Sequence, residues 1–148
     1  MSERISHSLV KALRSVPDLA ELDEATLLRI VGASTNLFWE SGGSVFEAGS
    51  PSEALFIVLS GEISVSEATG EGESEIARIG PGDSFGELSL MLHTTHTRSA
   101  RATQPTELMV VPRESFEELL SSNPEVAARF RSRLGERLAV RGAVKGTT

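Results

Sequence analysis

The sequence predicts a mainly β fold with helices at both ends, and three observations support this prediction. Apolar residues recur at helical spacing near the N-terminus, alternate with a period of two from about residue 35 to residue 111, and return to helical spacing after Pro112. Turn-forming residues separate the short alternating segments. A chain of 148 residues fits a single core, and short strands at this density indicate a barrel or a double-sheet roll.

Residues 1–34 are expected to form an N-terminal helical segment with two short helices. Apolar side chains at helical spacing precede Pro17, which ends the first helix: Ile5, Leu9, Val10, Leu13 and Val16. Asp23 can cap the second helix, because an aspartate at this position accepts a hydrogen bond from a free backbone N–H group. The apolar positions of that helix extend to Gly32, a residue that favours a helix end.

Residues 35–112 are expected to form the β region. Seven segments alternate in polarity or form short apolar runs, and each is predicted to be a strand: 36–40, 44–47, 54–59, 63–66, 75–79, 100–102 and 106–111. Turn-forming residues fill the intervals, for example Gly42-Gly43 and Gly80-Pro81-Gly82-Asp83. Such residues accept positive φ angles or fix a turn, so the strands are expected to follow one another closely.

Residues 113–148 are expected to form a C-terminal helical segment within the same domain. Asn123 and Pro124 predict the start of the last helix, since they suit the N-cap and the first turn. One side of this helix carries an apolar stripe: Val126, Phe130, Leu134 and Leu138. Its surface is also basic, with Arg129, Arg131, Arg133, Arg137 and Arg141. Two interpretations are open: the helix has a solvated basic face, or its stripe serves as a lid on the roll or as a seam with a second copy of the chain.

The charge distribution disfavours a nucleic-acid partner. Residues 1–121 hold 8 Lys and Arg against 19 Asp and Glu, a net charge of −11, while residues 122–148 hold 6 against 2, a net charge of +4. An acidic body repels a phosphate backbone. The sequence has no cysteine, no signal-peptide pattern and no apolar run of the roughly 18 residues that a membrane helix needs, so a cytoplasmic protein without membrane contact is expected.

Motifs for catalysis and for metal binding are missing from the sequence. There is no Gly-x-Ser-x-Gly, His-Glu-x-x-His or Gly-x-x-x-x-Gly-Lys-Ser/Thr motif, so we expect no enzyme activity and no catalytic residue. His93 and His96 lie near Glu87, but the third histidine, His7, falls in the first helix. This spacing does not fit the metal ligands of a cupin, and no metal site is expected.

The segment from Gly80 to Leu92 carries the strongest chemical signal. A glycine-rich bend leads into an apolar helical turn, so backbone N–H groups and the positive end of the helix dipole are expected to face one point, which suits a phosphate. Glu87 in the first helical turn has two interpretations. It complements the helix dipole, or it accepts hydrogen bonds from the hydroxyl groups of a sugar.

Three stretches of the sequence occur in one order and at a consistent spacing: Arg14–Pro17, Leu55–Glu62 and Gly80–Leu88. Together they resemble the cyclic nucleotide-binding domains of the catabolite activator protein, of the regulatory subunits of cyclic-AMP-dependent kinase and of cyclic-nucleotide-gated channels. The resemblance implies an eight-stranded β-roll, like a double-stranded jelly roll, with N-terminal helices and C-terminal helices of the family's B and C types. It also implies a phosphate-binding cassette over residues 80–103, with Gly86 and Glu87 near the ribose of cyclic AMP or cyclic GMP and no further cofactor.

The cassette departs from the family pattern at the phosphate-binding arginine. By the resemblance, His96 stands at that position, and Arg98 stands where the family has a small residue. Imidazole is neutral above about pH 6.5 and lacks the two-pronged geometry of a guanidinium. Because charge-assisted hydrogen bonds contribute about 1.5–3 kcal/mol each, the affinity for a cyclic nucleotide is expected to be weaker by at least about 10–100-fold. Three interpretations are open: His96 binds the phosphate as imidazolium, Arg98 reaches it, or the cassette has lost its ligand.

Two functions follow as hypotheses. The first is a non-enzymatic, stand-alone ligand-sensing domain in signal transduction that binds cyclic AMP, cyclic GMP or a related sugar phosphate with reduced or altered affinity. Its expected ligand-binding residues are Phe85, Gly86, Glu87, Leu88, Ser89, His96, Thr97 and Arg98. The second is a ligand-free module of the same fold that binds an effector protein or forms a homodimer through the C-terminal helix.

Overall fold

Two helices open the chain, as the apolar periodicity predicts, and a short 3-10 helix lies between them where a turn was expected. The computed structural model describes residues 3–132. Its first elements are α1 (Glu3–Arg14), the 3-10 helix η1 (Pro17–Leu19) and α2 (Glu24–Ala33). The Asp23 carboxylate accepts a hydrogen bond from the Thr26 N–H group at 2.9 Å, which confirms the predicted cap of α2.

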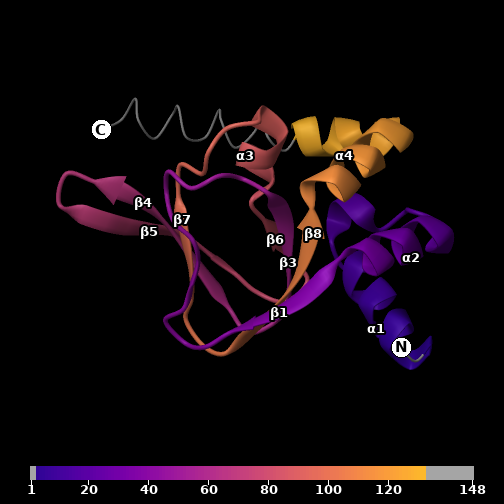
Figure 1. Cartoon of the computed structure of the whole chain (residues 1–148), viewed down its shortest axis with the longest axis horizontal. Helices are drawn as coiled ribbons and strands as arrows, with labels where there is room; N and C mark the ends of the chain where they lie inside the picture. The colour runs from indigo at the N-terminus through magenta and orange to yellow at the C-terminus, as the bar shows by residue number, and fades with distance from the viewer. Residues whose placement is uncertain (1–2, 133–148) are drawn as a thin grey trace.

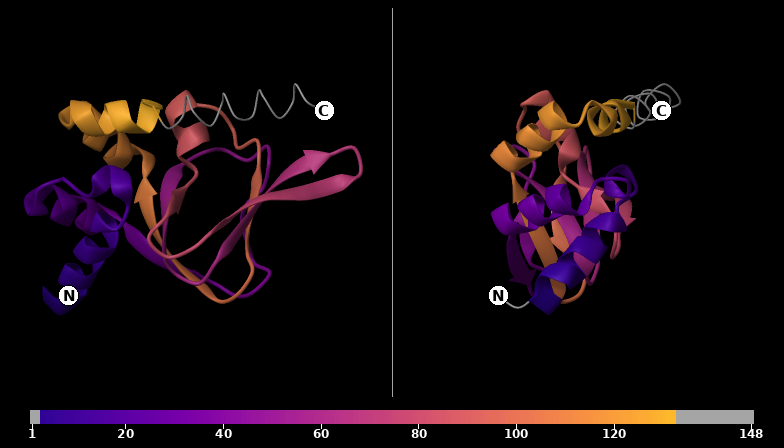
Figure 2. Two further views of the ribbon diagram at one scale, coloured as in Figure 1. Left: turned by 180° about the vertical axis from the view of Figure 1, so that it is seen from behind. Right: turned by 90° about the vertical axis from the view of Figure 1, so that its right-hand side faces the viewer.

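Eight strands form two antiparallel sheets, which confirms the predicted mainly β roll. The strands are β1 (Thr35–Trp39), β2 (Ser44–Phe46), β3 (Ala54–Ser60), β4 (Ile63–Thr69), β5 (Gly72–Ile79), β6 (Ser84–Phe85), β7 (Ser99–Ala102) and β8 (Thr106–Pro112). Sheet A has the order β1-β8-β3-β6, and sheet B has the order β2-β7-β4-β5. Figures 1 and 2 show the β4–β5 hairpin extending from the roll on the side opposite α1 and α2.

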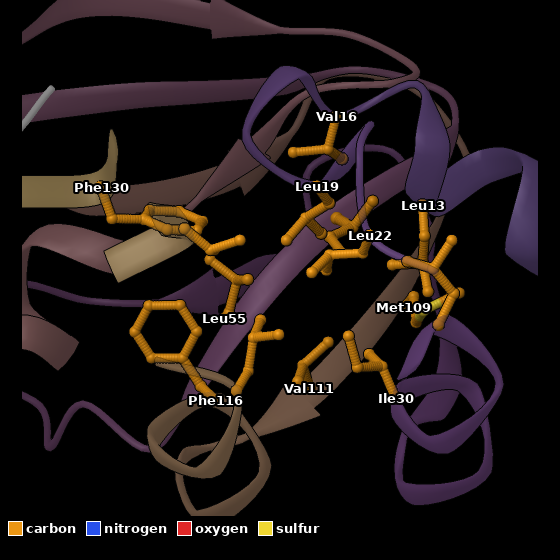
Figure 3. Packing of buried hydrophobic residues seen from close by; sticks show 14 of the residues in the cluster. Leu13, Val16, Leu19, Leu22, Ile30, Leu55, Met109, Val111, Phe116 and Phe130 are labelled. Carbon is orange, nitrogen blue, oxygen red and sulfur yellow. The ribbon is translucent and has the colours of Figure 1, made fainter. Parts of the chain in front are cut away.

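Sheet A separates two apolar cores, because β3 and β8 bury side chains on both of their faces. The helical core lies between sheet A and the helices (Figure 3) and includes Leu13, Val16, Leu19, Leu22, Ile30, Leu55, Met109, Val111, Phe116 and Phe130. The roll core lies between the two sheets and consists of Val58, Ile63, Val65, Phe85, Ala100, Ala102 and Leu108. The helices therefore cover one face of sheet A, and the other face closes the roll.

The C-terminal part of the described chain is helical. Helix α4 (Arg113–Ser122) is followed by helical residues 124–132. Asn123 lies between them: its carbonyl accepts from the Ala127 N–H group at 3.1 Å, and its side-chain amide donates to the Leu119 carbonyl at 3.0 Å.

The first half of the predicted apolar stripe packs on the chain's own helices. Val126 and Phe130 are buried in the helical core, where the Phe130 ring meets Phe116 edge to face at 5.3 Å. The rest of the stripe, Leu134 and Leu138, lies outside the described residues, as do Arg133, Arg137 and Arg141. The expected lid or dimer seam therefore stays a prediction.

Candidate ligand-binding site

The cassette begins with a sharp change of direction between β6 and α3 (Glu87–Leu92). Gly86 adopts a φ angle of 88°, in the left-handed region that favours glycine. A Cβ atom at this position would lie 3.1 Å from Cδ2 of Phe56, whose ring stacks on Phe85 with 5.1 Å between centroids. Glycine is therefore needed here for its backbone angle, and it also lets β3 approach the turn closely.

The polar residues that begin α3 are turned into the protein. Glu87 is 3% exposed and Ser89 is 5% exposed, while Leu88 is the second residue of the helix. The Leu90 N–H group already donates to the Gly86 carbonyl, at 3.4 Å. A buried carboxylate in a first helical turn is favoured by the helix dipole, so the position of Glu87 agrees with both of its sequence-based interpretations.

His96 is buried and lies flat against an aromatic ring. It is 4% exposed, and its imidazole stacks on Phe46 with 3.6 Å between centroids and 4° between ring planes. The main chain on either side is fixed as well, because the His96 N–H group donates to Ser50 and its carbonyl accepts from Gly49. Burial lowers the pKa of the His96 imidazole from its usual 6.5. At neutral pH this position therefore carries an uncharged ring.

An open cavity of about 470 Å³ lies beside His96. We call it the His96 cavity; its lining comes from β2, β3, the loop between them and the end of the cassette, namely Ser44, Val45, Phe46, Glu47, Ser50, Pro51, Glu53, Phe56 and His96. Its volume falls within the roughly 300–1,000 Å³ of small-molecule sites. Three of these lining residues are aromatic, two are glutamates, and none is a lysine or an arginine. The cavity therefore suits a flat group with hydrogen-bond donors better than it suits a bare phosphate.

Arg98 and Thr97 occupy different environments. The chain bends at residues 97–98, Thr97 is exposed, and Arg98 is half-buried. The Arg98 Nε atom lies 3.5 Å from Oε1 of Glu67 on β4. The guanidinium thus faces a carboxylate of sheet B. Glu67 has no local signal in the sequence that links it to the cassette, because it lies on a different strand. Phe46 is one of several phenylalanines that the sequence assigns to packing, with lining of a base pocket as the alternative.

Arg113 connects the far end of the cassette helix to α4. Its guanidinium donates to the carbonyls of Leu90 (3.1 Å) and Ser52, and it also contacts Nδ1 of His93 at 3.1 Å and the Glu117 carboxylate. Ser52 precedes Glu53 of the cavity lining, and Leu90 belongs to α3. One side chain therefore joins the cavity loop, the cassette helix and the C-terminal helices.

A sequence comparison decides the family. The profile of the family described as "Cyclic nucleotide-binding domain" matches residues 37–123, more than half of the chain. The chain belongs to the cyclic nucleotide-binding domain family. This membership confirms the resemblance on which the cassette assignment rests, although the roles of the individual site residues stay predictions.

Relatives of this domain occur inside much larger proteins and in kinase regulatory subunits. Glutaminase 2 of Bradyrhizobium diazoefficiens is 34% identical over 83% of this chain and 19% of its own length. The chain spans less than a fifth of the length of the first curated relatives that it matches.

Two solved structures give an informative contrast. The regulatory domain of Toxoplasma gondii protein kinase A, solved with cAMP, has a TM-score of 0.75 and 27% identity over 80% of this chain and 45% of its own. The regulatory subunit of a cAMP-independent protein kinase A from Trypanosoma brucei also has a TM-score of 0.75, with 25% identity over 85% of this chain and 47% of its own. The same fold thus occurs in a cAMP complex and in a kinase described as cAMP-independent.

Residues 3–132 contain no group of three or more His, Cys, Asp or Glu side chains that could hold a metal ion. No described helix has the length and apolar character needed to cross a membrane.

Proposed function

We propose that this chain is a non-catalytic regulatory domain that binds cyclic AMP, cyclic GMP or a related sugar phosphate more weakly than a family member with arginine at position 96. The supporting observation is the His96 cavity, an open site next to the cassette in a chain that belongs to the cyclic nucleotide-binding family. Phe46 and Phe56 offer apolar ring surface to a base, and the carboxylates of Glu47 and Glu53 can accept hydrogen bonds from hydroxyl or amino groups.

The weaker affinity follows from the charges around the cassette. His96 is uncharged at neutral pH because of its burial, and Arg98 is paired with Glu67. Glu47 and Glu53 on the cavity wall repel an anion. A cyclic phosphate therefore meets no unpaired fixed cation among the residues that line the cavity, which removes the bidentate contact that binds phosphate most strongly.

A second candidate function is a ligand-free interaction module of the same fold. The flat stack of His96 on Phe46 favours it, since this ring already has a packing partner at 3.6 Å. The T. brucei regulatory subunit, at 25% identity, belongs to a kinase that is described as cAMP-independent, so this fold also occurs where cAMP is not the activator. Such a module would bind its effector protein or a second copy of itself through the helices.

Thermal unfolding with and without millimolar cyclic AMP or cyclic GMP separates the two functions. A ligand at 100 times its dissociation constant adds about 2.7 kcal/mol to the free energy of unfolding. We expect a rise in Tm with at least one of the two nucleotides and none with 5′-AMP at equal concentration. Unchanged unfolding with both cyclic nucleotides would favour the interaction module.

The variant His96→Arg tests the assignment of the phosphate position. Restoring a guanidinium at this point is expected to raise the cyclic nucleotide affinity by about 10–100-fold, as measured by calorimetric titration. Thr97→Arg is the matched control, because it adds the same charge one residue along on an exposed side chain. Equal gains from both variants would show a general effect of charge and would refute the assignment.

A further inference from the structure

An ion pair joins the two strands of sheet B that enclose the cassette end of the roll. On β4, Glu67 follows Ile63 (0% exposed) and Val65 (8% exposed) at intervals of two, so it shares the face that forms the roll core. Arg98 lies in the bend directly before β7, whose first residue, Ser99, pairs with Ser66. The two charged side chains are therefore neighbours across the strands at the edge of the roll core.

The contact between Arg98 and Glu67 is close enough for strong attraction but long for a hydrogen bond. Nε and Oε1 lie 3.5 Å apart, and the side chains are only 24% and 28% exposed. The Arg98 Nε atom is buried and makes no hydrogen bond within the described residues. Water screens such a pair poorly, yet the guanidinium retains donor capacity that a better acceptor could use.

Arg98 is also the single permanent charge in its part of the cassette. Residues 93–98 contain two histidines, three threonines and this one arginine. The anion with which Arg98 interacts in the structure comes from Glu67 of the same chain. A phosphate that reached Arg98 would have to replace this carboxylate and would then lie beside it, which adds repulsion between like charges.

We propose that Glu67 is a specificity-determining residue of the ligand site, whose carboxylate competes with the ligand's phosphate for Arg98. This inference rests on the proposed function and names the residue that sets its affinity. A cyclic nucleotide displaces Glu67 because its base and sugar contribute further contacts.

A double-mutant cycle measures this competition directly. Calorimetric titrations with cyclic AMP and cyclic GMP, at one pH and one salt concentration, compare the parent chain with Glu67→Gln, Arg98→Gln and the double variant. We expect Glu67→Gln to raise the affinity by about tenfold in the parent and to have no effect in the Arg98→Gln chain. Glu75→Gln is the matched control, because Glu75 pairs with Arg78 on the exposed part of the hairpin, and it should leave the affinity unchanged.

If Glu67→Gln binds a cyclic nucleotide and the parent shows no measurable binding, this result also supports competition between Glu67 and the ligand's phosphate for Arg98. If the parent binds and Glu67→Gln changes its affinity less than twofold, or if the gain persists without Arg98 or appears equally in Glu75→Gln, the competition is refuted while the proposed function stands. If no variant binds either nucleotide, the proposed function fails and this inference fails with it. Glu67→Ala provides a second neutral side chain should Glu67→Gln prove unfolded by circular dichroism.

Discussion

The helical core packs between sheet A and the helices, whereas the margin of the roll core carries a buried imidazole and lies next to an ion pair. His96 stacks on Phe46 at the margin of the roll core, and Arg98 and Glu67 lie at the edge of the same core, close to Ala100 and Val65. Apolar side chains of similar volume would avoid the desolvation that these polar groups undergo. We therefore expect substitutions in the helical core to change stability most, and substitutions at the margin of the roll core to change ligand binding.

Phe116→Ala tests the helical core and should produce the largest loss of stability. Phe116 is 1% exposed and contacts Phe130 edge to face. Removal of a fully buried ring leaves a cavity, so the free energy of unfolding should fall by about 3–5 kcal/mol in a urea titration. Phe38→Ala, at a ring that is 75% exposed, is the control and should change stability by less than about 0.5 kcal/mol. Similar losses from both variants would remove the distinction between this core and the surface.

Gly86→Ala tests the cassette turn and should have an intermediate effect. Alanine is strained at a φ angle of 88°, and its Cβ atom would also press on the Phe56 ring at 3.1 Å. We expect a loss of about 1–3 kcal/mol in the same titration. Gly42 has a φ angle of 87°, and a Cβ atom there would meet nothing within 4 Å, so Gly42→Ala isolates the backbone strain and should lose less. A loss at Gly86 no greater than at Gly42 would show that the close approach of β3 is unimportant.

His96→Phe tests the polar part of the roll side and should have the smallest effect at neutral pH. Phenylalanine preserves the ring stack on Phe46 and removes the ionisable group. Burial depresses the pKa of His96 in the folded chain, so below about pH 6.5 the unfolded chain binds more protons and the parent loses stability as the pH falls. His96→Phe should lack this part of the pH dependence, and its Tm should exceed that of the parent increasingly between pH 6.5 and pH 5.

As the pH falls over the same range, the parent should lose stability, but its affinity for a cyclic nucleotide should rise. A phosphate that contacts His96 favours imidazolium, so the affinity for a cyclic nucleotide should rise as the pH falls below 6.5. Glu47 and Glu53 are the other ionisable residues that line the same cavity. Affinity that is independent of pH in the parent would show that His96 does not bind the phosphate.

The order of elements could be predicted from the sequence because it depends on local periodicity. Asp23 and the short apolar runs of β3 and β8 each have a short-range signal, and the structure bears them out. Strand β6 was missed, since two residues are too few for any period to show. Strand β5 begins at Gly72, earlier than predicted, because the tip of the hairpin is exposed on both faces and has no apolar alternation.

The site could be predicted only in part, because the residues that contact the cassette come from other strands of the chain. The family resemblance assigns Gly86, Glu87 and His96 to the site, and these roles stay predictions. The aromatic partner of His96 lies on β2, and the partner of Arg98 lies on β4. Such pairs depend on which strands become neighbours in the sheets, and residue spacing within one segment carries no information about that.

The exposed β4–β5 hairpin has a consequence for encounters between copies of the chain. Strand β5 ends the described part of sheet B, and unpaired backbone groups at such a margin can recruit a strand from another molecule and start aggregation. Glu73 and Glu75 lie along β5, where they accept hydrogen bonds from Ser66 and Ser64. Two β5 strands that approached each other would bring these acidic side chains together, so their mutual repulsion protects the hairpin from polymerising with itself.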